Sequence, residues 1–120
     1  MTVVANVLVG LVALIHGYIV VLEMFLWTTP RARAAFGTTE AFARESRPLA
    51  ANQGLYNGFL AAALVWGLIA TDPSGFQLKL YGLACVIVAG LFGAATASKR
   101  ILFVQVLPAA LALVFLLLSR

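Results

Sequence analysis

The sequence predicts an all-α protein: a four-helix transmembrane up-and-down bundle with both termini on the non-cytoplasmic side. Of its 120 residues, 63% are hydrophobic and only 10% are charged, whereas about a quarter of the residues in soluble domains are charged. The apolar residues gather in four long runs, and most basic residues lie in the links between those runs. A soluble fold of this size cannot cover so much apolar surface, so lipid is the expected solvent.

Each of the four apolar runs is long enough to cross a bilayer as a helix. The runs cover about residues 3–27, 48–70, 78–97 and 101–118. A hydrocarbon core of about 30 Å needs roughly 20 helical residues, and helices satisfy their own backbone polar groups in lipid. No run shows the strict alternation of a membrane strand. We therefore expect a single integral membrane domain over residues 1–120.

The first run is expected to be a retained membrane helix rather than a signal peptide. No Lys or Arg lies between Met1 and Ile15, so the positively charged start of a signal peptide is lacking. The run also continues beyond the usual length of a signal-peptide core without a small-residue cleavage site.

The links between the runs differ in length. Residues 28–47 form the only long loop, within which residues 38–46 are expected either as a short interfacial helix or as solvated chain. The links at 72–75 and 98–100 are short, which makes the last three helices antiparallel neighbours.

Two prolines lie within the apolar runs. Pro48 fits the first turn of the second helix, where a missing backbone N–H costs nothing. Pro108 lies inside the fourth helix and is expected to kink it.

The distribution of Lys and Arg predicts the orientation. Four arginines lie in loop 28–47 and two basic residues lie at 98–100, whereas only Lys79 and Arg120 lie on the other side. The positive-inside rule therefore places both of these loops in the cytoplasm. The basic residues form no face with interleaved aromatic residues, so no nucleic-acid partner is expected.

The first run, which includes "LIHGYIVVLEMFLW" at 14–27, carries a histidine and a glutamate. A charged side chain at the centre of a membrane helix costs about 2.5–3.5 kcal/mol on insertion scales, so such residues usually find a partner. His16 and Glu23 are seven residues apart, which places them on one face but roughly 10 Å from each other. Each therefore needs a partner from another helix.

The second run supplies four polar side chains within its first three turns: Asn52, Gln53, Tyr56 and Asn57. The first and second helices run antiparallel and are joined on the cytoplasmic side. We expect the first two of these side chains at the depth of Glu23, and the last two nearer the depth of His16. The result would be a polar stripe from the cytoplasmic mouth toward the centre of the bundle.

These six residues form the predicted ligand-binding site: His16, Glu23, Asn52, Gln53, Tyr56 and Asn57. A carboxylate and an imidazole at different depths can relay a proton or hold the polar head of a small amphipathic molecule, and we favour binding or translocation of this kind. One alternative is a membrane enzyme that uses Glu23 or His16 as acid–base on a lipid-soluble substrate. The other is a structural accessory subunit, whose amides join two helices for roughly 0.6 kcal/mol each. Catalytic residues and cofactors stay unassigned, and no spacing typical of metal ligands is present.

The stretches "HGYIVVLEMFLW" and "NQGLYNGFLAAAL" resemble a family of small bacterial four-helix membrane proteins, domain of unknown function 1304. The resemblance covers essentially the whole chain and implies a multi-pass protein of the bacterial inner (plasma) membrane, with the lipid bilayer as its main partner. The family residues that it implies are His16, Glu23, Met24, Trp27, Asn52, Gln53, Tyr56 and Asn57. No established activity comes with the resemblance. Four short helices make a thin wall for a pore, so a carrier of this type is expected to act as a homo-oligomer.

Overall fold

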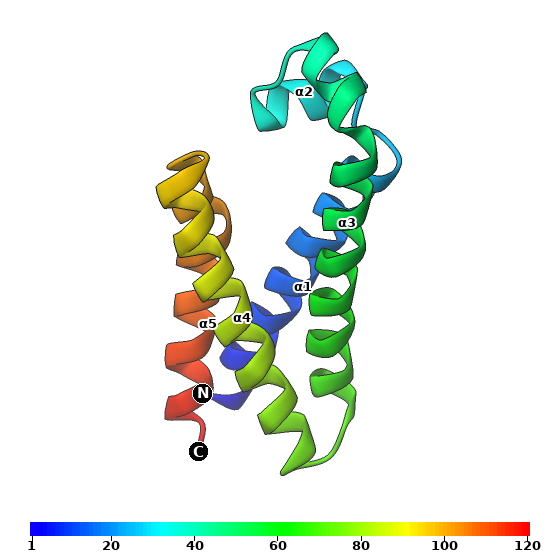
Figure 1. The fold of residues 1–120 in the computed structure, drawn as a ribbon. Coiled ribbons are helices and arrows are strands. Elements are labelled where there is room, and N and C mark those ends of the chain that lie inside the picture. Colours follow the sequence, from blue (N-terminus) through cyan, green and yellow to red (C-terminus); the bar gives the residue numbers. More distant parts are fainter. The chain divides into compact units, whose positions relative to one another are not determined.

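The computed structural model describes all residues 1–120, and every regular element in it is a helix. In chain order, as coloured in Figure 1, the elements are α1 (Thr2–Met24), α2 (Pro30–Phe36), α3 (Glu40–Ile69), α4 (Ser74–Thr96), the π-helical turn η1 (Leu102–Val106) and α5 (Leu107–Leu118). The predicted all-α class is confirmed.

Two of the helices, α1 and α4, are long and apolar enough to cross a membrane. Each has 23 residues, and only 33% and 22% of their most apolar windows are buried inside the protein. A core helix of a soluble protein would be mostly buried, so these helices present apolar faces that the chain itself does not cover. The apolar stretch Leu102–Leu118 is shorter. α3 is longer, but the charged residues and amides in its first half lower its mean hydropathy.

The chain packs as two compact units, which are described separately. Unit 1 contains residues 1–15 and 60–120, and unit 2 contains residues 16–59. Helices α1 and α3 each contribute residues to both units. The expected single membrane domain over residues 1–120 stays a prediction.

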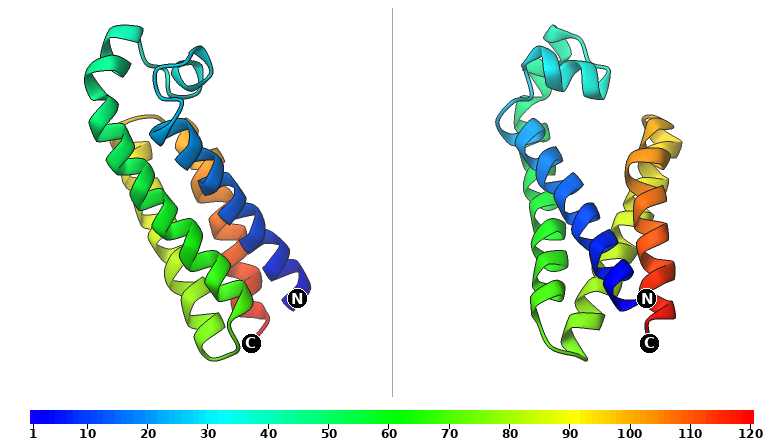
Figure 2. Two further views of the ribbon diagram at one scale, coloured as in Figure 1. Left: turned by 90° about the vertical axis from the view of Figure 1, so that its right-hand side faces the viewer. Right: turned by 180° about the vertical axis from the view of Figure 1, so that it is seen from behind.

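Unit 1 is built around an apolar core to which four helices contribute. Its buried members are Ala5, Val9, Val12, Ala13, Leu64, Leu83, Val86, Ala109, Ala112 and Leu116. On α1 and α5 these residues recur every three or four positions, so each helix buries one face. A Cβ atom on Gly82 would lie 2.7 Å from Cδ2 of Leu64, so α4 passes close to α3 only because residue 82 has no side chain. Figure 2 shows α4 and α5 side by side in this unit.

A π-helical turn lies just before Pro108, the residue at which the sequence predicts a kink. The N–H of Leu107 donates to the carbonyl of Leu102, five residues earlier. Pro108 follows within the same continuous helix, where its missing N–H leaves a carbonyl of the preceding turn without that helical bond. The helix therefore accommodates the proline by a local change in its hydrogen-bond pattern.

In unit 2 the predicted loop 28–47 is largely helical, which corrects the expected helix bounds. Helix α2 begins at Pro30, where the Thr29 hydroxyl accepts from the Ala32 N–H at 3.4 Å. It ends at Gly37, whose φ of 69° is the left-handed conformation that glycine adopts without strain.

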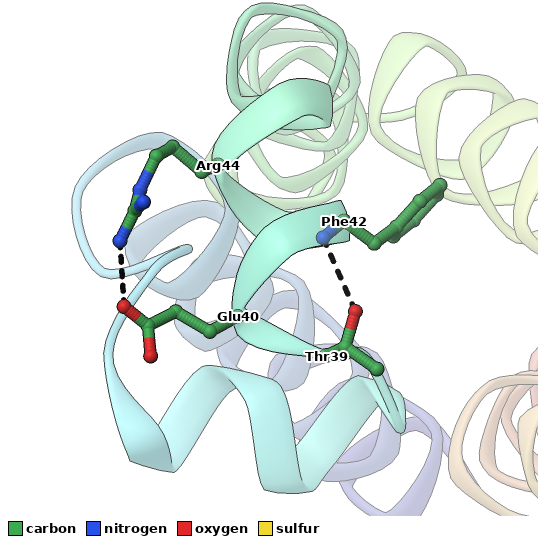
Figure 3. A network of polar contacts seen from close by, with 4 residues as sticks. All are labelled: Thr39, Glu40, Phe42 and Arg44. Atoms are coloured by element: carbon green, nitrogen blue, oxygen red, sulfur yellow. Dashed lines mark hydrogen bonds and ion pairs between the residues drawn. The ribbon is translucent and has the colours of Figure 1, made fainter.

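Helix α3 begins at Glu40, so Pro48 lies inside the helix and not in its first turn. The Thr39 hydroxyl accepts from the Phe42 N–H at 3.1 Å, and Arg44 pairs with Glu40 at 2.6 Å one turn away (Figure 3). These contacts start the helix two turns before the proline. The segment 38–46 is therefore the beginning of α3 and not a separate interfacial helix.

Trp27 connects α2 to α3 within unit 2. Its indole N–H donates to the Ser46 hydroxyl at 3.0 Å, and its ring lies 4.9 Å from the ring of Phe36. Ala32 and Ala43 are completely buried. The short helix is thus held to α3 by one hydrogen bond, one aromatic contact and small residues that permit close approach.

Candidate functional site

The centre of the site is a hydrogen bond between α1 and α3 in unit 2. Glu23 lies in the last turn of α1, and its Oε1 accepts from Nδ2 of Asn57 at 2.6 Å. This short distance is typical of a bond to an ionised acceptor. Both side chains are partly buried. Of the six predicted residues, these two are brought into direct contact.

Two glycines of α3 bring α1 close enough for this bond. A Cβ on Gly54 would lie 2.5 Å from Cγ of Met24 and 3.1 Å from Cβ of Glu23. A Cβ on Gly58 would lie 3.8 Å from Cγ2 of Val20. Gly54, Asn57 and Gly58 follow the i, i+3, i+4 spacing of one helix face, so a single face of α3 meets α1.

His16 is almost completely buried, with 1% of its surface exposed. It lies seven residues before Glu23 on the same helix, so the two side chains are about 10 Å apart along the axis. The imidazole therefore stands at a different level from the Glu23–Asn57 pair.

Asn52, Gln53 and Tyr56 are exposed, and the structure does not bring them to Glu23. The ring of Tyr56 makes an edge contact with Phe59, with centroids 5.7 Å apart. Asn52 and Gln53 immediately precede Gly54, which meets Glu23 and Met24, but their side chains are exposed, and Asn57 is the amide that donates to the carboxylate. The reason is the rotation of α3, which turns Gly54, Asn57 and Gly58 toward α1.

The Glu23 carboxylate keeps one oxygen open. Asn57 is the only side chain that hydrogen-bonds it, and no basic side chain forms an ion pair with it. An ionised carboxylate has about four acceptor positions, so most of its capacity is unused. The site can therefore accept a hydrogen bond from a ligand or take up a proton.

Basic side chains lie in the same unit as the carboxylate. Arg31 of α2 approaches the hydroxyl of Tyr18 on α1, with 3.4 Å between Nη1 and the oxygen. This hydrogen bond raises the pKa of the exposed Arg31 guanidinium above its ordinary value, so the group stays charged. No group of three His, Cys, Asp or Glu side chains converges to hold a metal ion.

A second polar pair, in unit 1, had only a weak signal in the sequence. Lys79 of α4 donates through Nζ to Oδ1 of Asn6 on α1 at 2.9 Å. Both residues are isolated polar positions within apolar runs, which is the one feature that could have singled them out. Spacing alone does not reveal that they face each other.

The fold and the site together define a small helical protein with two helices able to cross a membrane and a polar contact between α1 and α3. Residues 10–117 match the family described as protein of unknown function (DUF1304). The chain is 32% identical over 107 residues to the uncharacterized protein YpaA of Lactococcus lactis subsp. lactis, which covers 88% of this chain and 89% of the relative. The chain belongs to the DUF1304 family, and the resemblance found in the sequence is confirmed. No solved structure matches it significantly.

Proposed function

We propose that this protein is a multi-pass protein of the bacterial inner membrane, which crosses it four times through α1, α3, α4 and the η1–α5 stretch. The apolar faces of α1 and α4 that the chain leaves uncovered support this placement. The stretch 102–118 has 17 residues, about 26 Å of helix, and a bilayer thins locally around a span of that length. The excess of Lys and Arg at 28–47 and 98–100 supports cytoplasmic loops there and both termini outside.

The favoured function is binding, and with it translocation, of a small polar or amphipathic molecule or a proton at Glu23. The observation that carries this proposal is the Glu23–Asn57 contact, in which a partly buried carboxylate uses one oxygen and keeps the other available. The only protein donor is a neutral amide, so the carboxylate charge is not neutralised. A ligand with a cationic or hydrogen-bond-donating head would neutralise or hydrogen-bond this carboxylate.

The roles follow from position. Glu23 is the anchor or proton acceptor, Asn57 orients the carboxylate, and His16 provides the deeper protonatable group. Asn52, Gln53 and Tyr56 are exposed on α3, where they would contact a ligand head, a second copy of the chain or the membrane interface.

Native mass spectrometry of the wild type beside Glu23→Gln tests the proposal. The protein is released from nanodiscs made of its host's lipids, and the mass gives oligomer size and retained small molecules together. A discrete ligand present on the wild type and lost from Glu23→Gln is the expected result. If no ligand is retained, proton uptake is measured in liposomes with a pH-sensitive dye. Equal proton flux in both proteins would then reject the proposal.

A structural role is the second candidate, and the close crossing at Gly54 favours it. Tight packing beside a partly buried amide is typical of contacts that hold membrane helices together. Glu23→Gln preserves a hydrogen bond to Asn57, so a purely structural pair should tolerate it. Unchanged thermal stability together with lost ligand or proton uptake separates the functional role from the structural one.

A further inference from the structure

Unit 1 contains a pocket that is separate from the Glu23 site. It has a volume of about 640 Å³ and lies between the start of α1, the α3–α4 turn, the first turns of α4 and the end of α5. Pockets that take small organic ligands measure about 300–1,000 Å³. The lining combines the apolar side chains of Phe76 and Leu116 with polar and charged groups.

Lys79 is the most constrained of the charged groups that line the pocket. It is 8% exposed, and its stem crosses α3 at Gly67, where a Cβ would lie 2.7 Å from Cγ of the lysine. Its ammonium donates to the neutral oxygen of Asn6. An ammonium has three N–H donors, so two remain for another acceptor. Three helices thus hold this lysine in place.

Arg120 adds a second cation to the same pocket. Its guanidinium lies 4.5 Å from the centroid of the Phe76 ring, a cation–π distance that leaves its N–H groups available. Asp72 is the one carboxylate side chain in the lining, and its Oδ1 accepts from the Phe76 N–H at 3.0 Å. Neither cation belongs to the Arg44–Glu40 salt bridge, and neither forms an ion pair with Asp72.

We propose that this pocket binds a phosphate-type oxyanion, with Lys79 and Arg120 as its ligands. Two unneutralised cations with spare donors attract such a group, and a buried ammonium gains most from a charged acceptor. The phosphate can belong to the head group of a phospholipid or be free in solution. The apolar part of the lining and the volume suit a head group with its glycerol.

The lipid arm of the test uses native mass spectrometry of the full chain with phosphatidylglycerol and with diacylglycerol of the same acyl chains. The test variants are Arg120→Gln and Lys79→Met, and Lys99→Met is the matched control because Lys99 is exposed outside the pocket. The wild type and the control should retain phosphatidylglycerol over diacylglycerol. Retention should fall at least about tenfold in Arg120→Gln, since hydrogen bonds to a charged group are lost.

The second arm titrates inorganic phosphate into the detergent-solubilised protein and follows the ³¹P signal. Saturable binding that Arg120→Gln abolishes, without retention of lipid, assigns the site to a free oxyanion. Arg120 is exposed, so this variant stays informative even where Lys79→Met fails to fold.

The proposal is overturned if the wild type shows neither a preference for phosphatidylglycerol nor saturable phosphate binding. It is also overturned if Lys99→Met lowers retention as much as Arg120→Gln does. Glu23→Gln should leave both signals unchanged, so the failure of this site and the failure of the Glu23 site are distinguishable.

Discussion

In each of the two units a charged side chain forms a hydrogen bond with a neutral asparagine. The charged side chain is an anion in unit 2 and a cation in unit 1. In unit 2 the Glu23 carboxylate accepts from Asn57 at 2.6 Å, and in unit 1 the Lys79 ammonium donates to Asn6 at 2.9 Å. Helix α1 supplies the charged member of the first pair and the neutral member of the second. An asparagine can serve both signs because its amide carries an acceptor oxygen and a donor nitrogen.

The two pairs differ in their surroundings. Lys79 is 8% exposed and belongs to the unit with the ten-residue apolar core, whereas Glu23 is only partly buried beside the glycine crossing. A charge that is buried more completely costs more when its partner is removed. The comparison teaches that the lysine is fixed in place by its unit, while the glutamate carboxylate is more exposed and accepts one side-chain hydrogen bond, from Asn57.

The largest expected effect tests the core of unit 1. Leu64→Ala should lower the free energy of unfolding by about 2–5 kcal/mol, because Leu64 is fully buried in that core. Leu14→Ala is the control, since Leu14 is 71% exposed and should change stability little. Unfolding by SDS titration in mixed micelles measures both. Equal losses in the two variants would contradict the assignment of the core.

The glycine crossings provide the second test. Gly67→Ala should cost about 1–3 kcal/mol, because the new Cβ would lie 2.9 Å from the backbone nitrogen of Lys79. Gly54→Ala should cost less, since its nearest neighbour is the flexible side chain of Met24. Gly17→Ala meets no atom within 4 Å and serves as the control. The same SDS titration should rank the three variants in this order.

Removing each asparagine sharpens the comparison of the two charges. Asn6→Leu leaves the Lys79 ammonium without its acceptor and should cost about 1–3 kcal/mol. Asn57→Leu should cost about 0.6 kcal/mol, the average for a polar contact between membrane helices, since Glu23 is more accessible. A larger loss for Asn57→Leu would reverse the proposed difference between the units.

The smallest effect is expected at the surface ion pair of α3. Glu40→Gln removes the ion pair with Arg44. The side chain of Arg44 is 72% exposed and that of Glu40 is 62% exposed. Exposed pairs one helical turn apart contribute no more than about 0.5 kcal/mol. Thermal melts at low and high salt should differ little between wild type and variant, and a shift of several degrees would contradict this.

The sequence predicted the all-α class and the need of Glu23 for a partner on the next helix. Asn57 donates to the carboxylate, whereas Asn52 and Gln53, which the sequence placed at the depth of Glu23, are exposed. Which amide meets Glu23 depends on the rotation of α3 about its axis, and the close approach of Gly54 to Met24 that accompanies this rotation is a tertiary property.

The sequence pattern also did not predict the start of α3 or the Lys79–Asn6 hydrogen bond. A proline usually marks a helix start, but Thr39 and the Glu40–Arg44 pair begin this helix two turns earlier. Lys79 counted only as a charge that sets orientation, because the rotation of α4 about its axis depends on packing against Gly67. Periodicity defines which residues share a face, but not which neighbour that face meets.

The π-helical turn η1 gives this segment one residue more than a regular α-helix needs. A π-helical turn contains one residue more than an α-helical turn, so removal of one residue from Leu102–Val106 would restore ordinary α-helical spacing and leave the rotation of α5 nearly unchanged. Leu116 would then stay in the core. Phe103 and Val104 are exposed and can be replaced by other apolar residues. This stretch should therefore tolerate both substitutions and the removal of one residue, whereas removal of one residue between Ala109 and Leu116 would rotate Leu116 by about 100° and out of the core.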